Sequence, residues 1–395
     1  MWVGLSLKSC LQCQSNIEAN LDATCVTPRL HQQDLLKFVH RPKVQRLEFL
    51  PCKISETSNT GHVLWELRRL SKKLSTKQRT SGTPSVPNPR SGRSGRSTSQ
   101  GWLTDFSNQI KKFYNKATHV YEELGPSAAA YYILRTAERI RMKAELVEAS
   151  AFHIKEEDKM VYQLQNAFNQ GGLTQAPDIL SLQSQLSPKV GRLIAFLERQ
   201  EPEECSGLIF VQQRAIVGVL YTILANHPRT MTRFKCATFV GLSNSSHGKL
   251  ALCELLDKEV QKDTMLEFRN GKKNIVIATD ALEEGIDVAA CNLVVCFDAP
   301  PSLKSYIQRR GRARMHASQY VIMVPKDSTQ TKLDSWPELE NTLAKMYQDD
   351  DRARTRIALL ENEQESVDDR LCIGATEYVT FKFFIKSLTK PAEPI

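Results

Sequence analysis

Residues 274–278 read Asn-Ile-Val-Ile-Ala, and two similar runs follow at residues 291–297 and 320–324. Each run is short, apolar and rich in β-branched residues, which is the pattern of a strand buried on both faces of a sheet. Between the second and third runs, residues 302–310 have an apolar face at helical spacing. This alternation predicts an α/β fold built on a parallel sheet, with functional residues in the loops.

Two polar segments accompany these runs. Residues 278–287 read Ala-Thr-Asp-Ala-Leu-Glu-Glu-Gly-Ile-Asp, and residues 306–314 read Tyr-Ile-Gln-Arg-Arg-Gly-Arg-Ala-Arg. Gly285 allows the backbone to turn tightly against a ligand, and Asp287 can accept hydrogen bonds from hydroxyl groups such as those of a ribose. The second segment places an amide and three guanidinium groups around a glycine bend, namely Gln308, Arg310, Arg312 and Arg314. Guanidinium groups bind phosphate bidentately and stay charged, so the two segments together indicate a polyphosphate site.

At this spacing the two segments resemble motifs five and six of superfamily 2 helicases. The ending Gly-Arg-Ala-Arg is similar to that of the Dicer and RIG-I-like group, and residues 293–300 and 305–307 resemble the fungal Dicer-like proteins. The resemblance extends with gaps from about residue 17 to about residue 369. It implies a RecA-like parallel sheet, the second helicase domain, with an inserted α-helical bundle and a trailing helical arm.

The resemblance also implies where a nucleotide binds. In this family ATP lies in a cleft between two RecA-like domains, and Mg²⁺ accompanies it in the intact enzyme. The matching positions in this chain are Gly285, Asp287, Gln308, Arg312 and Arg314. Arg312 and Arg314 are the expected catalytic residues, because both follow the bend and would reach the terminal phosphates. Arg309 and Arg310 precede the bend, and one of them can instead anchor the loop to an acid such as Asp287.

RNA is the expected macromolecular partner. The net charge is +9, and residues 61–120 carry twelve Lys and Arg against two acidic residues, which leaves the rest of the chain near neutral. A basic insert in a balanced protein indicates a polyanion, although an incidentally charged, solvated loop is the alternative. Within the insert, residues 62–77 predict a basic amphipathic helix and residues 80–101 a disordered linker. The expected RNA contacts are Gln212, which follows a strand predicted at residues 207–211, together with Thr279, Arg90, Arg93 and Arg96.

Two motifs of the helicase family do not occur in this sequence. The phosphate loop is absent, because neither Gly248-Lys249 nor Gly271-Lys272 is followed by the Ser or Thr that would ligate magnesium, and the Asp-Glu-x-His metal motif is absent too. We therefore expect this chain alone to bind neither ATP nor a metal and to lack RNA-stimulated ATPase activity. A zinc-like spacing exists at Cys10, Cys13, Cys25 and His31, but Cys25 lies in a segment that matches the family without any metal.

The resemblance divides the chain into five parts. Residues 1–55 are expected to be the end of the first RecA-like domain, and residues 56–186 a basic linker with a helical insertion. Residues 187–330 are expected to form the helicase C-terminal RecA-like domain, residues 331–369 a helical arm, and residues 370–395 the start of a Dicer dimerisation-like domain. We expect no ribonuclease III domain within these residues.

Two classes of function remain open at this point. The first is the C-terminal helicase portion of a Dicer-like, ATP-dependent enzyme that processes double-stranded RNA in RNA silencing or antiviral defence, with a separate first helicase domain as partner. The second is a non-catalytic double-stranded RNA-binding protein or decoy, and a truncated gene model is a third explanation. The longest apolar run, residues 216–225, is too short to span a bilayer. We expect no membrane partner and a cytoplasmic location, with the nucleus as the alternative.

Overall fold

The computed structural model describes residues 40–80, 99–147, 162, 165–166, 168–170, 172, 185–241, 261–283, 288, 290–326 and 331–346. The chain divides into two units, Val39–Thr329 and a second unit made of Met1–Phe38 with Gln330–Ile395. The described part of the second unit is helix α11 (Thr331–Met346), which lies within the range 331–369 where a helical arm was expected. All the other elements belong to the first unit.

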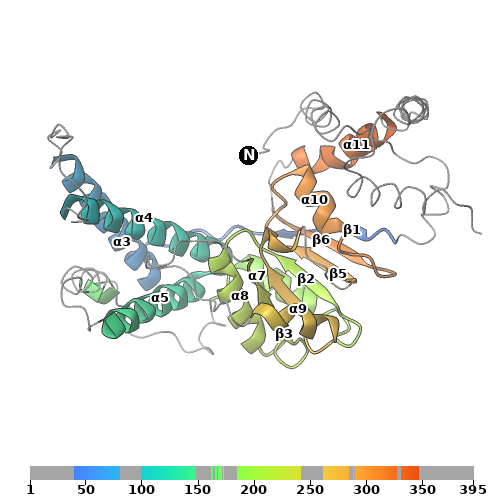
Figure 1. Cartoon of the computed structure of the whole chain (residues 1–395), viewed down its shortest axis with the longest axis horizontal. Coiled ribbons are helices and arrows are strands. Elements are labelled where there is room, and N and C mark those ends of the chain that lie inside the picture. Colours follow the sequence, from blue (N-terminus) through green and yellow to red (C-terminus); the bar gives the residue numbers. More distant parts are fainter. Residues whose placement is uncertain are drawn as a thin grey trace, which may run out of the picture. The chain divides into compact units, whose positions relative to one another are not determined.

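A six-stranded sheet forms the centre of the first unit (Figure 1). Its order is β1-β6-β5-β2-β4-β3, and every pair of neighbouring strands is parallel. The strands are β1 (Lys43–Phe49), β2 (Gly207–Phe210), β3 (Cys236–Phe239), β4 (Ile275–Ala278), β5 (Leu293–Cys296) and β6 (Gln319–Pro325). The α/β class with a parallel sheet is therefore confirmed.

Three of the four inner strands, β2, β4 and β5, are buried at every position, as their apolar sequences predicted. Parallel strands need crossover connections, and here helices supply most of them. These are α7 (Pro188–Leu197), α8 (Arg214–Asn226), α9 (Gln261–Arg269), the short 3₁₀ turn η2 (Asp280–Leu282) and α10 (Leu303–Arg310). Helix α10 coincides with the helix predicted at residues 302–310.

A three-helix insertion lies between β1 and the other five strands in the sequence. It contains α3 (Asn59–Thr80), α4 (Ser99–Leu124) and α5 (Pro126–Val147), which pack on one another (Figure 1). Val63, Leu64 and Leu67 form the buried face of α3, so the predicted amphipathic helix is confirmed. The linker predicted at residues 80–101 is shorter than expected, because α3 includes Thr80 and α4 begins at Ser99; residues 81–98 lie outside the described part.

Strand β1 was not among the predicted elements. It lies in the range 1–55 that the sequence analysis assigned to the preceding domain, and in the structure it pairs with β6 along seven residues, from Lys43 with Gln319 to Phe49 with Pro325. Its sequence, Lys-Val-Gln-Arg-Leu-Glu-Phe, is largely polar, which suits a strand that lies at the edge of the sheet and is mostly exposed. The edge strand therefore comes from residues far upstream of the other five.

Candidate functional site

The loops that follow β2, β4 and β5 lie together at the carboxyl ends of the strands. These strands are neighbours and run parallel, so their carboxyl ends meet where ligands bind in open α/β sheets. Gln212 follows β2, Thr279 follows β4 and Asp298 follows β5. The two RNA contacts predicted on strand ends are thus at the same edge.

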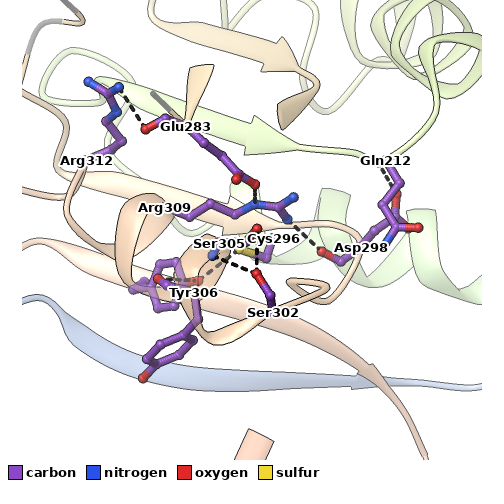
Figure 2. A network of polar contacts seen from close by, with 10 residues as sticks. Gln212, Glu283, Cys296, Asp298, Ser302, Ser305, Tyr306, Arg309 and Arg312 are labelled. Atoms are coloured by element: carbon purple, nitrogen blue, oxygen red, sulfur yellow. Dashed lines mark hydrogen bonds and ion pairs between the residues drawn. The ribbon is translucent and has the colours of Figure 1, made fainter. Parts of the chain in front are cut away.

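The side chains of these two predicted contacts differ in exposure. Gln212 is exposed, and its backbone N–H donates to Asp298 Oδ2 at 2.7 Å, which fixes the start of the loop and leaves the amide side chain facing solvent (Figure 2). Thr279 is only 4% exposed, and its backbone N–H donates to the carbonyl oxygen of Phe239 at 3.2 Å. Gln212 is therefore available for a ligand, whereas Thr279 is mostly covered in this conformation.

The arginine segment, residues 308–314, begins on α10 and bends at Gly311. Ser302 caps the start of α10 by accepting the backbone N–H of Ser305 at 3.1 Å. Beyond the bend, Ala313 forms a bridge with Cys291, and the backbone N–H of Arg314 donates to the carbonyl oxygen of Cys291 at 3.1 Å. The segment is thus held against the start of β5 on one side and by α10 on the other.

Arg309 is the most deeply buried charge of the site, with 1% of its surface exposed. Its Nε donates to Glu283 Oε1 at 2.7 Å and its Nη1 donates to the backbone oxygen of Asp298 at 3.1 Å (Figure 2). Its guanidinium lies 5.0 Å from the centroid of the Phe210 ring. Burial tends to lower the pKa of Arg309, but neighbouring Cys296 and Glu283 outweigh it and hold the pKa above its ordinary value. Arg309 therefore remains a cation that anchors the loop, and the acid it contacts among the described residues is Glu283.

The two predicted catalytic arginines lie in the same segment in different environments. Arg312 is 9% exposed, and its Nη2 donates to the backbone oxygen of Glu283 at 3.1 Å. Arg314 is exposed, and its Nε donates to the carbonyl oxygen of Gly311 at 2.7 Å. Gln308 is half-buried on α10. In this conformation Arg314 is the guanidinium that a ligand could approach most directly.

The remaining predicted site residues lie outside the described part of the chain. They are Gly285 and Asp287 for the nucleotide, Arg90, Arg93 and Arg96 for RNA, and the zinc-like group Cys10, Cys13, Cys25 and His31. Among the residues that the structure describes, no three His, Cys, Asp or Glu side chains gather as metal ligands, and no helix could cross a membrane. The donors of the arginine segment are guanidinium and backbone N–H groups, which fit a phosphate better than a metal ion.

A buried lysine that the sequence analysis missed completes the site. Lys189 lies on α7 and forms ion pairs with Glu123 of α4 and, at 3.0 Å, with Asp298 Oδ1. Its ammonium group lies 4.1 Å from the ring centroid of Phe297 and 5.0 Å from that of Phe49. A sequence signal did exist, because the lysine occupies the apolar stripe of α7, four residues before buried Leu193.

The residues of this site lie within a region of the chain that matches one domain family. The helicase conserved C-terminal domain matches residues 188–316, which include β2 to β5 and the arginine segment. Across the chain, Dicer-like protein 2 of Aspergillus fumigatus is 38% identical over 370 residues, covering 92% of this chain and 26% of that protein. The chain carries a Dicer-like helicase C-terminal domain.

Other fungal relatives are also Dicer-like proteins. Dicer-like protein 2 of Neosartorya fischeri is 37% identical over 376 residues and that of Coccidioides immitis 30% over 367 residues, covering 92% and 91% of this chain. The chain spans about a quarter of the length of these fungal relatives, 26% and 25% respectively. Among solved structures, the Hef helicase domain of Pyrococcus furiosus is 18% identical, with a TM-score of 0.39 over 84% of this chain and 64% of that one. The sequence identities of 30–38% over about nine tenths of this chain confirm the resemblance to fungal Dicer-like proteins.

Proposed function

We propose that this Dicer-like helicase domain works in an ATP-dependent enzyme that acts on double-stranded RNA, where it supplies the second half of the nucleotide site and part of the RNA grip. The arginine segment is the observation that carries this proposal. Its exposed Arg314 lies beside the start of β5, while buried Arg309 and Arg312 hold the segment in place, and exposed Gln212 follows the carboxyl end of the neighbouring strand β2.

The chemistry expected of this segment is electrostatic. Phosphoryl transfer develops charge on the transferred group, and an arginine that meets this charge contributes roughly 10³- to 10⁵-fold to the rate. Arg314 and Arg312 are the proposed residues for that contact. The phosphate loop and the Mg²⁺ ligands would come from a first RecA-like domain, because the described carboxylates of this site are occupied in pairing with Arg309 and Lys189.

The helical insertion supports the RNA part of the proposal. Helix α3 exposes four cations, Arg68, Arg69, Lys72 and Lys73, beside an exposed Trp65 whose ring lies 5.7 Å from the Arg69 guanidinium. Such a surface attracts a phosphate backbone without reading its sequence. RNA binding by the insertion would thus be strong at low salt and weak at high salt.

The test joins this chain to a helicase half that contains an intact phosphate loop and acidic motif. We expect RNA-stimulated ATP hydrolysis in the fusion and none in the chain alone. Arg314→Ala should lower turnover by roughly 10³-fold or more while the affinity for double-stranded RNA stays within about twofold, because a transition-state contact contributes to turnover without contributing to ground-state binding.

The matched control is Lys304→Ala, an exposed cation at the start of α10, and its turnover should stay near that of the unsubstituted fusion. Full turnover in Arg314→Ala would refute the assignment of this arginine. RNA binding without turnover in the unsubstituted fusion would favour a non-catalytic RNA-binding protein instead.

A further inference from the structure

A continuous series of polar contacts connects the helical insertion with the arginine segment. Glu123, in the last turn of α4, pairs with Lys189, and Lys189 pairs with Asp298. Asp298 then accepts the Gln212 backbone N–H through Oδ2 and a guanidinium N–H of Arg309 through its backbone oxygen. We call these five residues the Asp298 network.

The charges of this network are removed from water. The side chains of Lys189, Asp298 and Arg309 are 5%, 10% and 1% exposed. Buried ion pairs are often no more stabilising than apolar residues of the same size, but loss of one partner leaves an uncompensated charge and is costly. We therefore expect the network to add little to the free energy of unfolding compared with apolar residues. Its main effect is to fix the positions of its five residues.

The insertion end of the network is firmly attached. The backbone N–H of Ser187 donates to the carbonyl oxygen of Leu124 at 2.9 Å, and the Ser187 hydroxyl donates to the carbonyl oxygen of Glu123 at 2.5 Å. The same hydroxyl accepts the Val190 backbone N–H at the start of α7. Helix α4 therefore cannot shift relative to α7 without moving Lys189 or breaking these contacts.

We propose that Lys189 and Asp298 are positioning residues through which the helical insertion sets the position of Gln212 and of the arginine segment. Asp298 is the branch point, because one carboxylate oxygen faces the insertion through Lys189 and the other holds the Gln212 backbone, while its own backbone oxygen holds Arg309. This inference rests on the proposed function in one respect, namely that RNA on the insertion is the event that is transmitted.

Hydrogen exchange of the purified full chain, followed by mass spectrometry, tests the proposal without any nucleotide. Glu123→Gln keeps the size of the side chain and removes only its charge, and Lys189→Met removes the cation. In both variants we expect exchange at Gln212 and at residues 308–314 to rise about tenfold, the effect of losing one charge-assisted hydrogen bond. The double variant should show less than the product of the two single effects, because both changes break one series of contacts.

The matched control is Glu138→Gln, which removes a carboxylate from an exposed ion pair with Arg135 elsewhere in the insertion, 3.0 Å long. It should leave exchange at both segments unchanged. Lys189→Met can unfold because it leaves the buried carboxylate of Asp298 and the partly buried carboxylate of Glu123 without their cation, and in that case Glu123→Gln alone decides. Exchange that rises only around residues 120–125 and 187–190, or equally over the whole sheet, would overturn the proposal and leave a local structural role.

A second measurement adds double-stranded RNA at saturating concentration. In the unsubstituted chain we expect RNA to slow exchange at residues 308–314, and in Glu123→Gln we expect this protection to be lost although RNA is bound. Retained protection in the bound variant would count against transmission through this network. If the unsubstituted chain binds no double-stranded RNA, the proposed function fails, whereas the measurements without RNA still decide whether the network positions the segment.

Discussion

At the scale of single residues, Arg309 has the environment that most constrains substitution. Its charge is buried and paired with Glu283, so Arg309→Met would leave that carboxylate buried without its partner. Breaking one side of a buried pair costs about 3–5 kcal/mol. We expect a loss of that size in the free energy of unfolding measured with urea. The exposed neighbour Arg314→Met should change it by less than about 0.5 kcal/mol, and equal losses in both variants would contradict the buried pair.

His227 makes the stability of the fold sensitive to pH. It caps the carboxyl end of α8, and its Nδ1 accepts the backbone N–H of Arg229 at 3.2 Å. Burial and the charge of Arg229 lower the pKa of His227 below 6.5, against an opposing effect of Glu198. The unfolded chain therefore binds a proton more readily than the folded one, so the free energy of unfolding falls as the pH drops below 6.5 towards the folded-state pKa.

The measurement compares urea unfolding at about pH 7.5 and about pH 5.5. His227→Asn, which keeps an acceptor for the same backbone N–H, should lose less stability between these pH values than the unsubstituted chain. The exposed His62→Asn serves as the control and should lose as much as the unsubstituted chain. An identical pH dependence in all three proteins would exclude His227 as the cause.

At the scale of elements, the turn between α4 and α5 depends on a glycine. Gly125 has φ of +106°, and a Cβ there would lie 2.5 Å from the carbonyl oxygen of Gln185 and 2.7 Å from the backbone nitrogen of Ser187. Gly125→Ala should cost at least about 1–2 kcal/mol of unfolding free energy. Gly191→Ala is the matched control, since it lies in α7 with no atom within 4 Å of an added Cβ and should gain roughly 0.5–1 kcal/mol. Changes of the same sign would show that the turn is not constrained.

The elements also show which features a sequence can reveal. The inner strands and α10 were predictable because their signals are local, namely apolar runs and a helical stripe. Strand β1 was not, because its polar sequence becomes a strand only through pairing with β6 at the sheet edge. The motif predicted that arginines gather near residue 311, because that signal is local too. It did not predict that Arg309 is buried, since this depends on Glu283 and Asp298, or that Lys189 is buried, since its charge is paired with a carboxylate from α4.

At the scale of the whole molecule, binding of double-stranded RNA should depend steeply on salt. Each cation that contacts a phosphate contributes about 0.9 to the slope of log affinity against log salt on B-DNA, and we expect a similar value here. Changing Arg90, Arg93 and Arg96 to Gln should reduce the slope by about 1 to 3 in fluorescence anisotropy titrations. The comparison variant changes Arg68, Arg69 and Lys72 on α3 to Gln, and the change in its slope measures the contribution of the folded insertion to the salt dependence. An unchanged slope in the first variant would assign the electrostatics to α3 instead.

The parallel pairing of β1 with β6 also has a consequence for synthesis of the chain on the ribosome. Gln45 and Gln319, whose side chains are hydrogen-bonded at 2.8 Å, are 274 residues apart in the sequence. At roughly 5–20 residues per second, the first strand waits about 15 to 55 seconds before its partner has been translated. During that time the three-helix insertion, whose contacts are mostly local, can fold first. We expect the charged residues of the nascent edge strand, Lys43, Arg46 and Glu48, to disfavour premature pairing before β6 is available.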